Sequence, residues 1–387
     1  MVRYDPRPSR AAITLDKETK RTMAKHIPTV GIIGLGFGRA HIPAFQANGA
    51  EVVAVCQRDQ VTARAVADKY GVPRVFERWE DMLAEAQPEI AVIASPPHLH
   101  RAIALAAFAG GAHVLCEKPL AMTAAEGRDM VEAAARAGRI GMTGFNWRFP
   151  AAMQRFHAMV EAGHVGRPFH IGVRWLGGRW AEETAPATWR MDRAQAGHGA
   201  MGDQGVHVID LLRWNFGEIA RVMADEGIAF PSRSAPGVDR PPDAEDFCTV
   251  IAELASGAQA TFTVSRVARG ANEQTVECYG SQGGLTYKLD RVGSRWYRGE
   301  LQATEGSAAL APVSIAAGLP KSTGEGDQLE VTGKATIGPL VKRFLTAIKK
   351  GEQASPSLED GLRAQEVLDA VLESLRTRAW ASVPKPT

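Results

Sequence analysis

The sequence predicts a chain of two parts: an α/β domain with a parallel, doubly wound sheet, followed by an α+β domain with a large, mostly antiparallel sheet. In the first part, apolar strand-like runs alternate with helix-compatible stretches, which is typical of a parallel sheet. After residue 146 the pattern changes to alternating runs separated by turn residues. The length of 387 residues is enough for two domains that each bury a core.

The first domain is predicted to span residues 29–148. Its strands are expected at 30–34, 51–56, 90–94, 113–116 and 139–143, and its helices at 41–48, 61–70, 79–86, 98–109 and 124–136. The first strand is a continuous apolar run, as expected for a strand covered by helices on both faces.

The second domain is predicted to span residues 149–387. Helices are expected at 151–162, 201–216, 334–349 and 358–379, with strands at 169–175, at 222–226 and in an antiparallel meander over 247–289.

Composition excludes several classes of protein. A net charge of +2 gives no electrostatic basis for binding nucleic acid, and no apolar run is long enough to span a membrane. The four cysteines lack metal or disulfide spacing, which favours reduced thiols in a cytoplasmic protein. Residues 1–28 are polar and lack the apolar core of a secretory signal, so we expect a disordered extension or a start site upstream of the natural one at Met23.

A glycine-rich loop follows the first strand. Gly34, Gly36 and Gly38 lie between this strand and the next helix, with Phe37 and Arg39 among them. Such a loop brings bare backbone to a pyrophosphate at a helix N-terminus. Because Arg39 occupies the place of the usual third glycine, the motif alone is weak, and its position in the alternating domain carries the prediction of a dinucleotide site.

The end of the second strand bears on the choice of cofactor. An acidic residue there would bind the ribose of NAD, but this chain has Gln57 followed by Arg58. A guanidinium pairs well with a phosphate, so the sequence favours NADP over NAD. In the alternative, Arg58 is a solvated charge and Asp59 binds the ribose.

Two further loops fall at the same sheet edge. Glu117, Lys118 and Pro119 follow one strand, and a cis bond before the proline is one expectation. Ser95 and Pro96 follow another, and His98 and His100 come next. Ligands bind at this edge in open α/β folds. The two histidines are candidates for contact with the nicotinamide ribose, and the alternative for one of them is a role at the start of the helix.

The predicted helix 201–216 carries Asp203 and His207 four residues apart, on one face. Histidine is well suited to exchange a proton near neutral pH. A zinc site formed with His198 is a weaker alternative, because no spacing in the sequence supports it.

Aromatic residues cluster between the first strand of the second domain and the helix that carries His207, and others lie at the domain junction. Trp175, Trp180 and Trp189 lie in one short segment, where indoles could stack on a sugar ring or pack in a core or subunit interface. Trp147 and Arg148, at the domain junction, are the stronger candidates for contact with ligand.

From residue 29 to about 384, the chain resembles the glucose–fructose oxidoreductase / inositol dehydrogenase / MocA family. The resemblance rests on residues 34–41, 117–121 (Glu-Lys-Pro-Leu-Ala), 146–150 (Asn-Trp-Arg-Phe-Pro), 197–210 and 359–365. It implies a Rossmann domain, catalytic roles for Lys118, Asp203 and His207, and a homodimer or homotetramer formed through the C-terminal sheet. The chain departs from the family pattern at Gln57, at His198 and at the third glycine.

The predicted function is an NAD(P)-dependent dehydrogenase that oxidises a secondary hydroxyl of a sugar, sugar derivative or cyclitol. Two alternatives stay open: a redox-assisted glycoside-cleaving or coupled oxidoreductase with a tightly bound nicotinamide, and a non-catalytic NAD(P)-binding regulator. The predicted cofactor-binding residues are Gly34, Gly36, Phe37, Gly38, Arg39, Gln57, Arg58, Ser95, Pro96, His98, His100, Glu117, Lys118, Trp147 and Arg148. The predicted substrate-binding residues are Lys118, Trp147, Arg148, Trp175, Trp189, Asp203 and His207, and no metal is expected.

Overall fold

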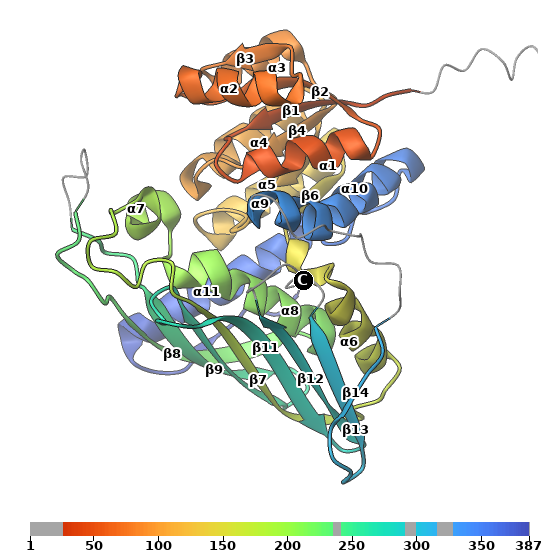
Figure 1. The fold of residues 1–387 in the computed structure, drawn as a ribbon, viewed down its shortest axis with the longest axis vertical. Coiled ribbons are helices and arrows are strands. Elements are labelled where there is room, and N and C mark those ends of the chain that lie inside the picture. Colours follow the sequence, from red (N-terminus) through yellow and green to blue (C-terminus); the bar gives the residue numbers. More distant parts are fainter. Residues whose placement is uncertain (1–25, 235–240, 291–298, 316–327, 387) are drawn as a thin grey trace, which may run out of the picture.

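Two sheets, each covered by helices, make up the fold (Figure 1). The structure is a computed structural model that describes residues 26–234, 241–290, 299–315 and 328–386. The expectation for residues 1–28 therefore falls almost wholly outside the described residues. In Figure 1 the first sheet lies at the top and the second, larger sheet lies at the bottom.

The first sheet has six strands in the order β3-β2-β1-β4-β5-β6, and all pairings are parallel. Its strands are β1 (Thr29–Ile33), β2 (Glu51–Cys56), β3 (Arg74–Phe76), β4 (Ile90–Ile93), β5 (His113–Cys116) and β6 (Gly141–Thr143). Every residue of β4 is buried, as expected of a central strand with helices on both faces.

Helices cover both faces of this sheet. They are α1 (His41–Ala47), α2 (Gln60–Tyr70), α3 (Trp79–Ala86), α4 (His100–Ala109) and α5 (Ala124–Ala137). One core joins α1 and α2 with α10 (Gly338–Lys350), and the other joins α3, α4 and α5 with the start of α11 (Leu358–Thr377). The C-terminal helices thus complete the covering of the N-terminal sheet.

The second sheet has nine strands in the order β14-β13-β12-β11-β7-β10-β9-β8-β15. They are β7 (Pro168–Gly177), β8 (Ile219–Gly227), β9 (Phe247–Leu254), β10 (Gln259–Ser265), β11 (Asn272–Gly280), β12 (Gly283–Asp290), β13 (Glu300–Glu305), β14 (Ala311–Pro312) and β15 (Ala381–Ser382). Only the β7–β10 pair is parallel among the described pairings, and the others are antiparallel.

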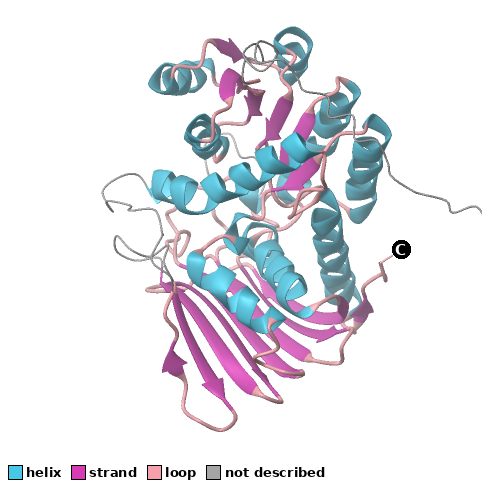
Figure 2. Ribbon diagram, turned by 90° about the vertical axis from the view of Figure 1, so that its right-hand side faces the viewer, coloured by secondary structure: helices cyan, strands magenta, loops and turns pink. Residues whose placement is uncertain are grey.

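The inner face of the second sheet packs on helices, and its outer face is open (Figure 2). Helices α6 (Ala151–Glu161), α8 (Val206–Phe216) and α11 contribute to this core. The short helices α7 (Arg193–Ala196) and α9 (Gln328–Thr332) lie closer to the first sheet. The two layers meet at α11, which contacts α5 and β6 on one side and α8 and β8 on the other.

The predicted fold class is confirmed, and four details of the prediction are wrong. Strands β3, β13, β14 and β15 were not predicted, because each is short or lies near an edge. The predicted meander is interrupted, because β7 inserts between β10 and β11. The predicted helix 201–216 begins as a π-helical turn, Met201–Gly205, before α8. Helix α10 is likewise preceded by a π-helical turn, Gly333–Ile337.

Candidate active site

The glycine loop has one position that must be glycine for the fold and one that faces open space. Gly34 has a φ of +88°, and a Cβ there would lie 2.5 Å from the carbonyl oxygen of Ala94. A Cβ on Gly38 would lie 3.0 Å from Ala94 Cβ, so this glycine allows close packing of helix and strand. At Gly36 no atom lies within 4 Å of an added Cβ. The backbone at Gly36 is therefore open to a ligand, which fits the cradle expected for a pyrophosphate.

Two side chains at the end of β2 already have partners. Gln57 Oε1 accepts a 2.8 Å hydrogen bond from the main-chain N–H of Leu35, inside the glycine loop. Asp59 caps α2 by accepting from the N–H groups of Val61 and Thr62. The alternative in which Asp59 binds the ribose thus requires a carboxylate that is already engaged.

Arg58, between these two residues, is exposed. Across the described ranges its guanidinium has no hydrogen bond and no ion pair. Arg58, the residue at this strand end that is predicted to bind the 2′-phosphate of NADP, is therefore available to a ligand.

The loop after β4 uses its two predicted histidines differently. His100 is fully buried, with Nε2 2.9 Å from the Ser95 carbonyl oxygen and Nδ1 3.0 Å from that of Pro119. Its ring joins the loops after β4 and β5 and has no nitrogen left for a cofactor, so its predicted contact with the nicotinamide ribose is contradicted. His98 instead reaches the second part of the chain, with Nδ1 3.2 Å from the Gln195 carbonyl oxygen. Ser95 and Pro96 lie directly before this turn, and Ser95 Oγ donates to the Pro96 carbonyl oxygen.

Glu117 is bound from the glycine-loop side. His41 Nε2, at the start of α1, lies 2.8 Å from Glu117 Oε1, and both side chains are buried. A Cβ on Gly144 would lie 2.9 Å from the Glu117 carboxylate, so β6 also closes on this group. Glu117 therefore ties the glycine loop to the strand end that carries Lys118.

Lys118 reaches across to the second part of the chain. Its Nζ donates to the main-chain oxygen of Asp203 at 2.7 Å and to Asp203 Oδ1 at 3.3 Å. The bond between Lys118 and Pro119 is cis, as the sequence led us to expect. Burial works to raise the pKa of the Asp203 carboxyl, but nearby cations outweigh it and hold the pKa well below its usual range. The cations are Lys118, Arg190 and Arg266.

His207 stands among three aromatic rings. The indole of Trp175 stacks on it at 5.4 Å between ring centroids, with an angle of 20° between the planes. Phe145 and Trp147 meet it edge-on at 6.0 and 6.4 Å. Trp147 and Trp175 also contact each other at 5.1 Å. These rings fix the plane of the imidazole and exclude water from its faces.

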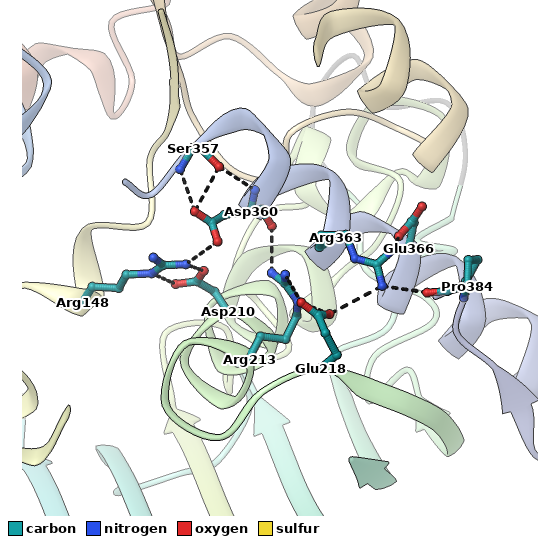
Figure 3. A network of polar contacts seen from close by, with 9 residues as sticks. All are labelled: Arg148, Asp210, Arg213, Glu218, Ser357, Asp360, Arg363, Glu366 and Pro384. Atoms are coloured by element: carbon teal, nitrogen blue, oxygen red, sulfur yellow. Dashed lines mark hydrogen bonds and ion pairs between the residues drawn. The ribbon is translucent and has the colours of Figure 1, made fainter. Parts of the chain in front are cut away.

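Arg148 does not belong to the ligand site, so its predicted contacts with cofactor and substrate are wrong. It is 3% exposed, and its guanidinium binds both carboxylate oxygens of Asp210, with Asp360 Oδ1 at 3.2 Å (Figure 3). Its remaining donor lies 3.3 Å from Ser355 Oγ. The same polar network continues from Arg213 of α8 through Glu218 to Arg363 of α11. Arg148 thus fastens the 3-10 turn carrying Trp147 to α8 and α11.

The other tryptophans divide between core and site. Trp180 is 7% exposed, packs in a small core of its own and lies under the guanidinium of Arg266. Trp189 is half-buried and carries the guanidinium of Arg190 on its ring, at 4.3 Å. Packing therefore explains Trp180, whereas Trp189 stands beside the charged groups near Asp203.

Sequence reasoning missed the groups that shape the turn containing Asp203. Glu245 Oε1 accepts 2.8 Å hydrogen bonds from the N–H groups of Gly199 and Met201, directly before the turn. Arg266 then donates to the main-chain oxygens of Arg190 and Glu245, at 3.1 and 2.9 Å. No sequence signal distinguishes Glu245 or Arg266, because their partners are main-chain atoms far away in the chain.

The zinc alternative finds no support. Among the residues that the structure describes, no three His, Cys, Asp or Glu side chains form a group that would hold a metal ion. Nor is any helix in these ranges long and apolar enough to cross a bilayer.

Comparisons with known proteins agree with this geometry. Residues 29–145 match the model of an oxidoreductase family with an NAD-binding Rossmann fold (GFO_IDH_MocA), and residues 153–286 match the GFO/IDH/MocA C-terminal domain. Levoglucosan dehydrogenase of Pseudarthrobacter phenanthrenivorans is 29% identical over 92% of this chain and 98% of its own.

Solved structures give the same result. An oxidoreductase domain protein from Kribbella flavida is 30% identical, with a TM-score of 0.82 over 93% of this chain and all of its own. A levoglucosan dehydrogenase in complex with NADH and levoglucosan is 28% identical, with a TM-score of 0.83 over 93% of this chain and all of its own. The matches define the class: the protein is an NAD(P)-dependent oxidoreductase acting on CH–OH groups. Within that class, the chain belongs to the Gfo/Idh/MocA family.

Proposed function

We propose that the protein is a dehydrogenase that reversibly oxidises a secondary hydroxyl of a sugar, sugar derivative or cyclitol, with NADP preferred over NAD. The observation that carries the proposal is the contact between Lys118 Nζ and Asp203, one helical turn before His207. It brings a cation and a carboxylate together at the carboxyl edge of a nucleotide-binding sheet, four residues before the His207 imidazole in the chain. The levoglucosan dehydrogenase relative supports a sugar as the substrate.

In the proposed mechanism His207 removes the proton of the substrate hydroxyl. Lys118 binds the same oxygen and stabilises the negative charge that develops on it, which an ammonium does well in a site with little water. Asp203 orients the Lys118 ammonium through the 3.3 Å contact with its Oδ1. A bound nicotinamide would supply the acceptor for the hydride that leaves the carbon. The aromatic rings around His207 keep its imidazole in one plane during proton transfer.

The choice of cofactor rests on the end of β2. Gln57 and Asp59 already bind main-chain groups, whereas Arg58 is exposed and presents its guanidinium. The 2′-phosphate of NADP would pair with the Arg58 guanidinium through charge-assisted hydrogen bonds. The open space at Gly36 would hold the pyrophosphate.

We also propose assembly through the open face of the second sheet. Outward residues of neighbouring strands form rows across it, such as Met223, Ile251, Thr261 and Gly172. Met223, Phe247 and Ile251 are 39–45% exposed, and a hollow of about 560 Å³ lies on the same face. A partner sheet would cover these apolar side chains. A cytoplasmic location agrees with four cysteines that are buried and free.

Absorbance at 340 nm tests the function. Purified protein is mixed with NADP or NAD and a panel of sugars, sugar acids and cyclitols, with the Lys118→Met variant as the inactive control. Net formation of NADPH that is lost in the variant supports a dehydrogenase. Conversion of a glycoside without net reduction of free cofactor would instead identify the redox-assisted alternative.

A further inference from the structure

Arg190 is a charged residue that the proposed mechanism does not use, on a segment tied by hydrogen bonds to the turn containing Asp203. It lies in the 3-10 turn Trp189–Met191, is half-buried, and stacks on the Trp189 ring at 4.3 Å. Among the described residues, its guanidinium makes no hydrogen bond and no ion pair. Its five N–H donors are therefore available on a side chain that the fold holds in place.

A chain of hydrogen bonds fixes Arg190 next to the turn containing Asp203. The Arg190 main-chain oxygen accepts from Arg266 Nη1 at 3.1 Å, and Arg266 Nη2 donates to the Glu245 main-chain oxygen at 2.9 Å. Glu245 Oε1 in turn binds the N–H groups of Gly199 and Met201, at the entry to this turn. The Asp203 carboxylate works to raise the pKa of Arg190, and the Arg190 cation works to lower the pKa of Asp203.

The charges in this region do not balance. Lys118 pairs with Asp203 at 3.3 Å, and Arg266 pairs with Asp246 at the same distance. Arg190 is left over, and Arg179, over the ring of Trp180, adds a further positive charge nearby. Burial lowers the pKa of Arg190, and the Asp203 carboxylate opposes that shift. An arginine nevertheless stays charged in proteins, so Arg190 is a partly desolvated cation without an ion-pair partner among the described residues.

We propose that Arg190 is a specificity-determining residue that binds an oxyanion of the substrate, so that the preferred substrates are acidic sugar derivatives. A carboxylate or a phosphate on the sugar would accept two parallel hydrogen bonds from the guanidinium fork. Trp189, directly beneath the guanidinium, would hold the fork in plane. The inference rests on the proposed function, because it names the substrate class of that same site.

The test compares acidic sugars with neutral counterparts of the same stereochemistry. Wild type and the Arg190→Gln and Arg190→Lys variants are assayed at 340 nm with hexuronates and their methyl esters, and with hexose 6-phosphates and free hexoses. We expect kcat/KM to favour an acidic member at least tenfold in the wild type. This ratio should fall toward one in Arg190→Gln and take an intermediate value in Arg190→Lys, which keeps the charge and loses the fork.

The matched control is Arg136→Gln. Arg136 is an exposed arginine in the last turn of α5, paired only with Glu132 within the described residues, and α5 ends at the opposite edge of the sheet. This variant should keep the wild-type ratio. Thermal unfolding of all variants checks that they fold. A preference for hexuronates identifies the anion as a carboxylate, and a preference for hexose phosphates identifies it as a phosphate.

Binding is measured separately from turnover, so that the inference and the proposed function can fail independently. Calorimetry with the NADPH-saturated protein gives the Kd of each hexuronate and of its methyl ester. Tighter binding of an acidic member, lost in Arg190→Gln, supports the inference even if no sugar is oxidised. Oxidation of neutral sugars without any preference for an acidic member, in turnover or in binding, overturns it and leaves the dehydrogenase function standing.

Discussion

Lys118 Nζ donates to both the main-chain oxygen and the Oδ1 of Asp203, at 2.7 and 3.3 Å, although the two residues lie 85 positions apart in the chain. Lys118 follows strand β5 of the parallel sheet, and Asp203 precedes α8, which packs on the second sheet. One ammonium therefore links the nucleotide-binding edge to the helix that carries His207. The cations around Asp203 keep the pKa of its carboxyl well below the usual range, so this carboxylate stays ionised through the pH range of ordinary assays.

Replacing this lysine should separate chemistry from cofactor binding. Lys118→Met removes the charge that stabilises the developing oxyanion, so we expect kcat to fall by about 100-fold or more. The Kd for NADPH, measured by fluorescence titration, should change little. Lys349→Met, at the exposed end of α10, is the matched control. Wild-type turnover in Lys118→Met would remove Lys118 from the mechanism.

The first two glycines of the loop should respond differently to substitution. Gly34→Ala forces a side chain at φ +88° against the Ala94 carbonyl, and should destabilise the fold by more than about 2 kcal/mol. An added Cβ at Gly36 meets nothing within 4 Å, so the melting temperature of Gly36→Val should stay near that of the wild type. Its affinity for NADP(H) should instead fall at least tenfold. Normal cofactor binding by Gly36→Val would show that the pyrophosphate lies elsewhere.

Arg58 should decide between the two nicotinamide cofactors. Arg58→Gln removes the proposed partner of the 2′-phosphate, so the Kd for NADP should rise by about tenfold and the Kd for NAD much less. Calorimetry with both cofactors gives the ratio directly. Arg64→Gln, an exposed residue on α2, should leave the ratio unchanged. Tighter binding of NAD than NADP by the wild type would refute the proposed preference.

We expect Arg148 to stabilise the folded state and not to bind a ligand. Removing one partner from the buried Arg148–Asp210 pair leaves an uncompensated charge, so Arg148→Gln should lower the free energy of unfolding by about 3 to 5 kcal/mol in urea. In the double variant Arg148→Gln/Asp210→Asn, part of this loss should be recovered, because the orphaned carboxylate is gone. A loss below about 1 kcal/mol, together with a weaker affinity for cofactor, would return Arg148 to the ligand site.

His198 should make the fold sensitive to mild acid. Burial lowers the pKa of this histidine from its ordinary value of 6.5, so below that pH the unfolded chain takes up a proton that the folded chain does not. Its stability contribution is complete above pH 6.5 and is lost as the pH falls toward the lowered pKa. His198→Gln should therefore lose less free energy of unfolding than the wild type when the pH is lowered from about 7.5 to about 5.5, as measured by urea unfolding. His170→Gln, an exposed change on β7, should behave like wild type.

Local patterns were sufficient to predict most of the first sheet. Continuous apolar runs identify β1, β2, β4 and β5, because a strand buried on both faces leaves a signature within its own few residues. β3 escaped prediction because three half-buried residues carry no period. The place of β7 was also beyond prediction, since its parallel pairing is with β10, whose paired residues lie 89 positions away in the chain.

In the candidate site, too, some residues were predicted from sequence motifs and others were placed only by the tertiary structure. The sequence by itself predicted the glycine loop, Lys118, Asp203 and His207 as site residues, because each sits in a short motif that resembles the family pattern. Only the tertiary structure showed that Arg148 and His100 are buried among polar partners, and that the Arg190 main chain is held by Arg266 while its guanidinium has no partner in the described part of the chain. A side chain's charge and length are local properties, whereas its burial and its partners depend on segments that meet only after folding.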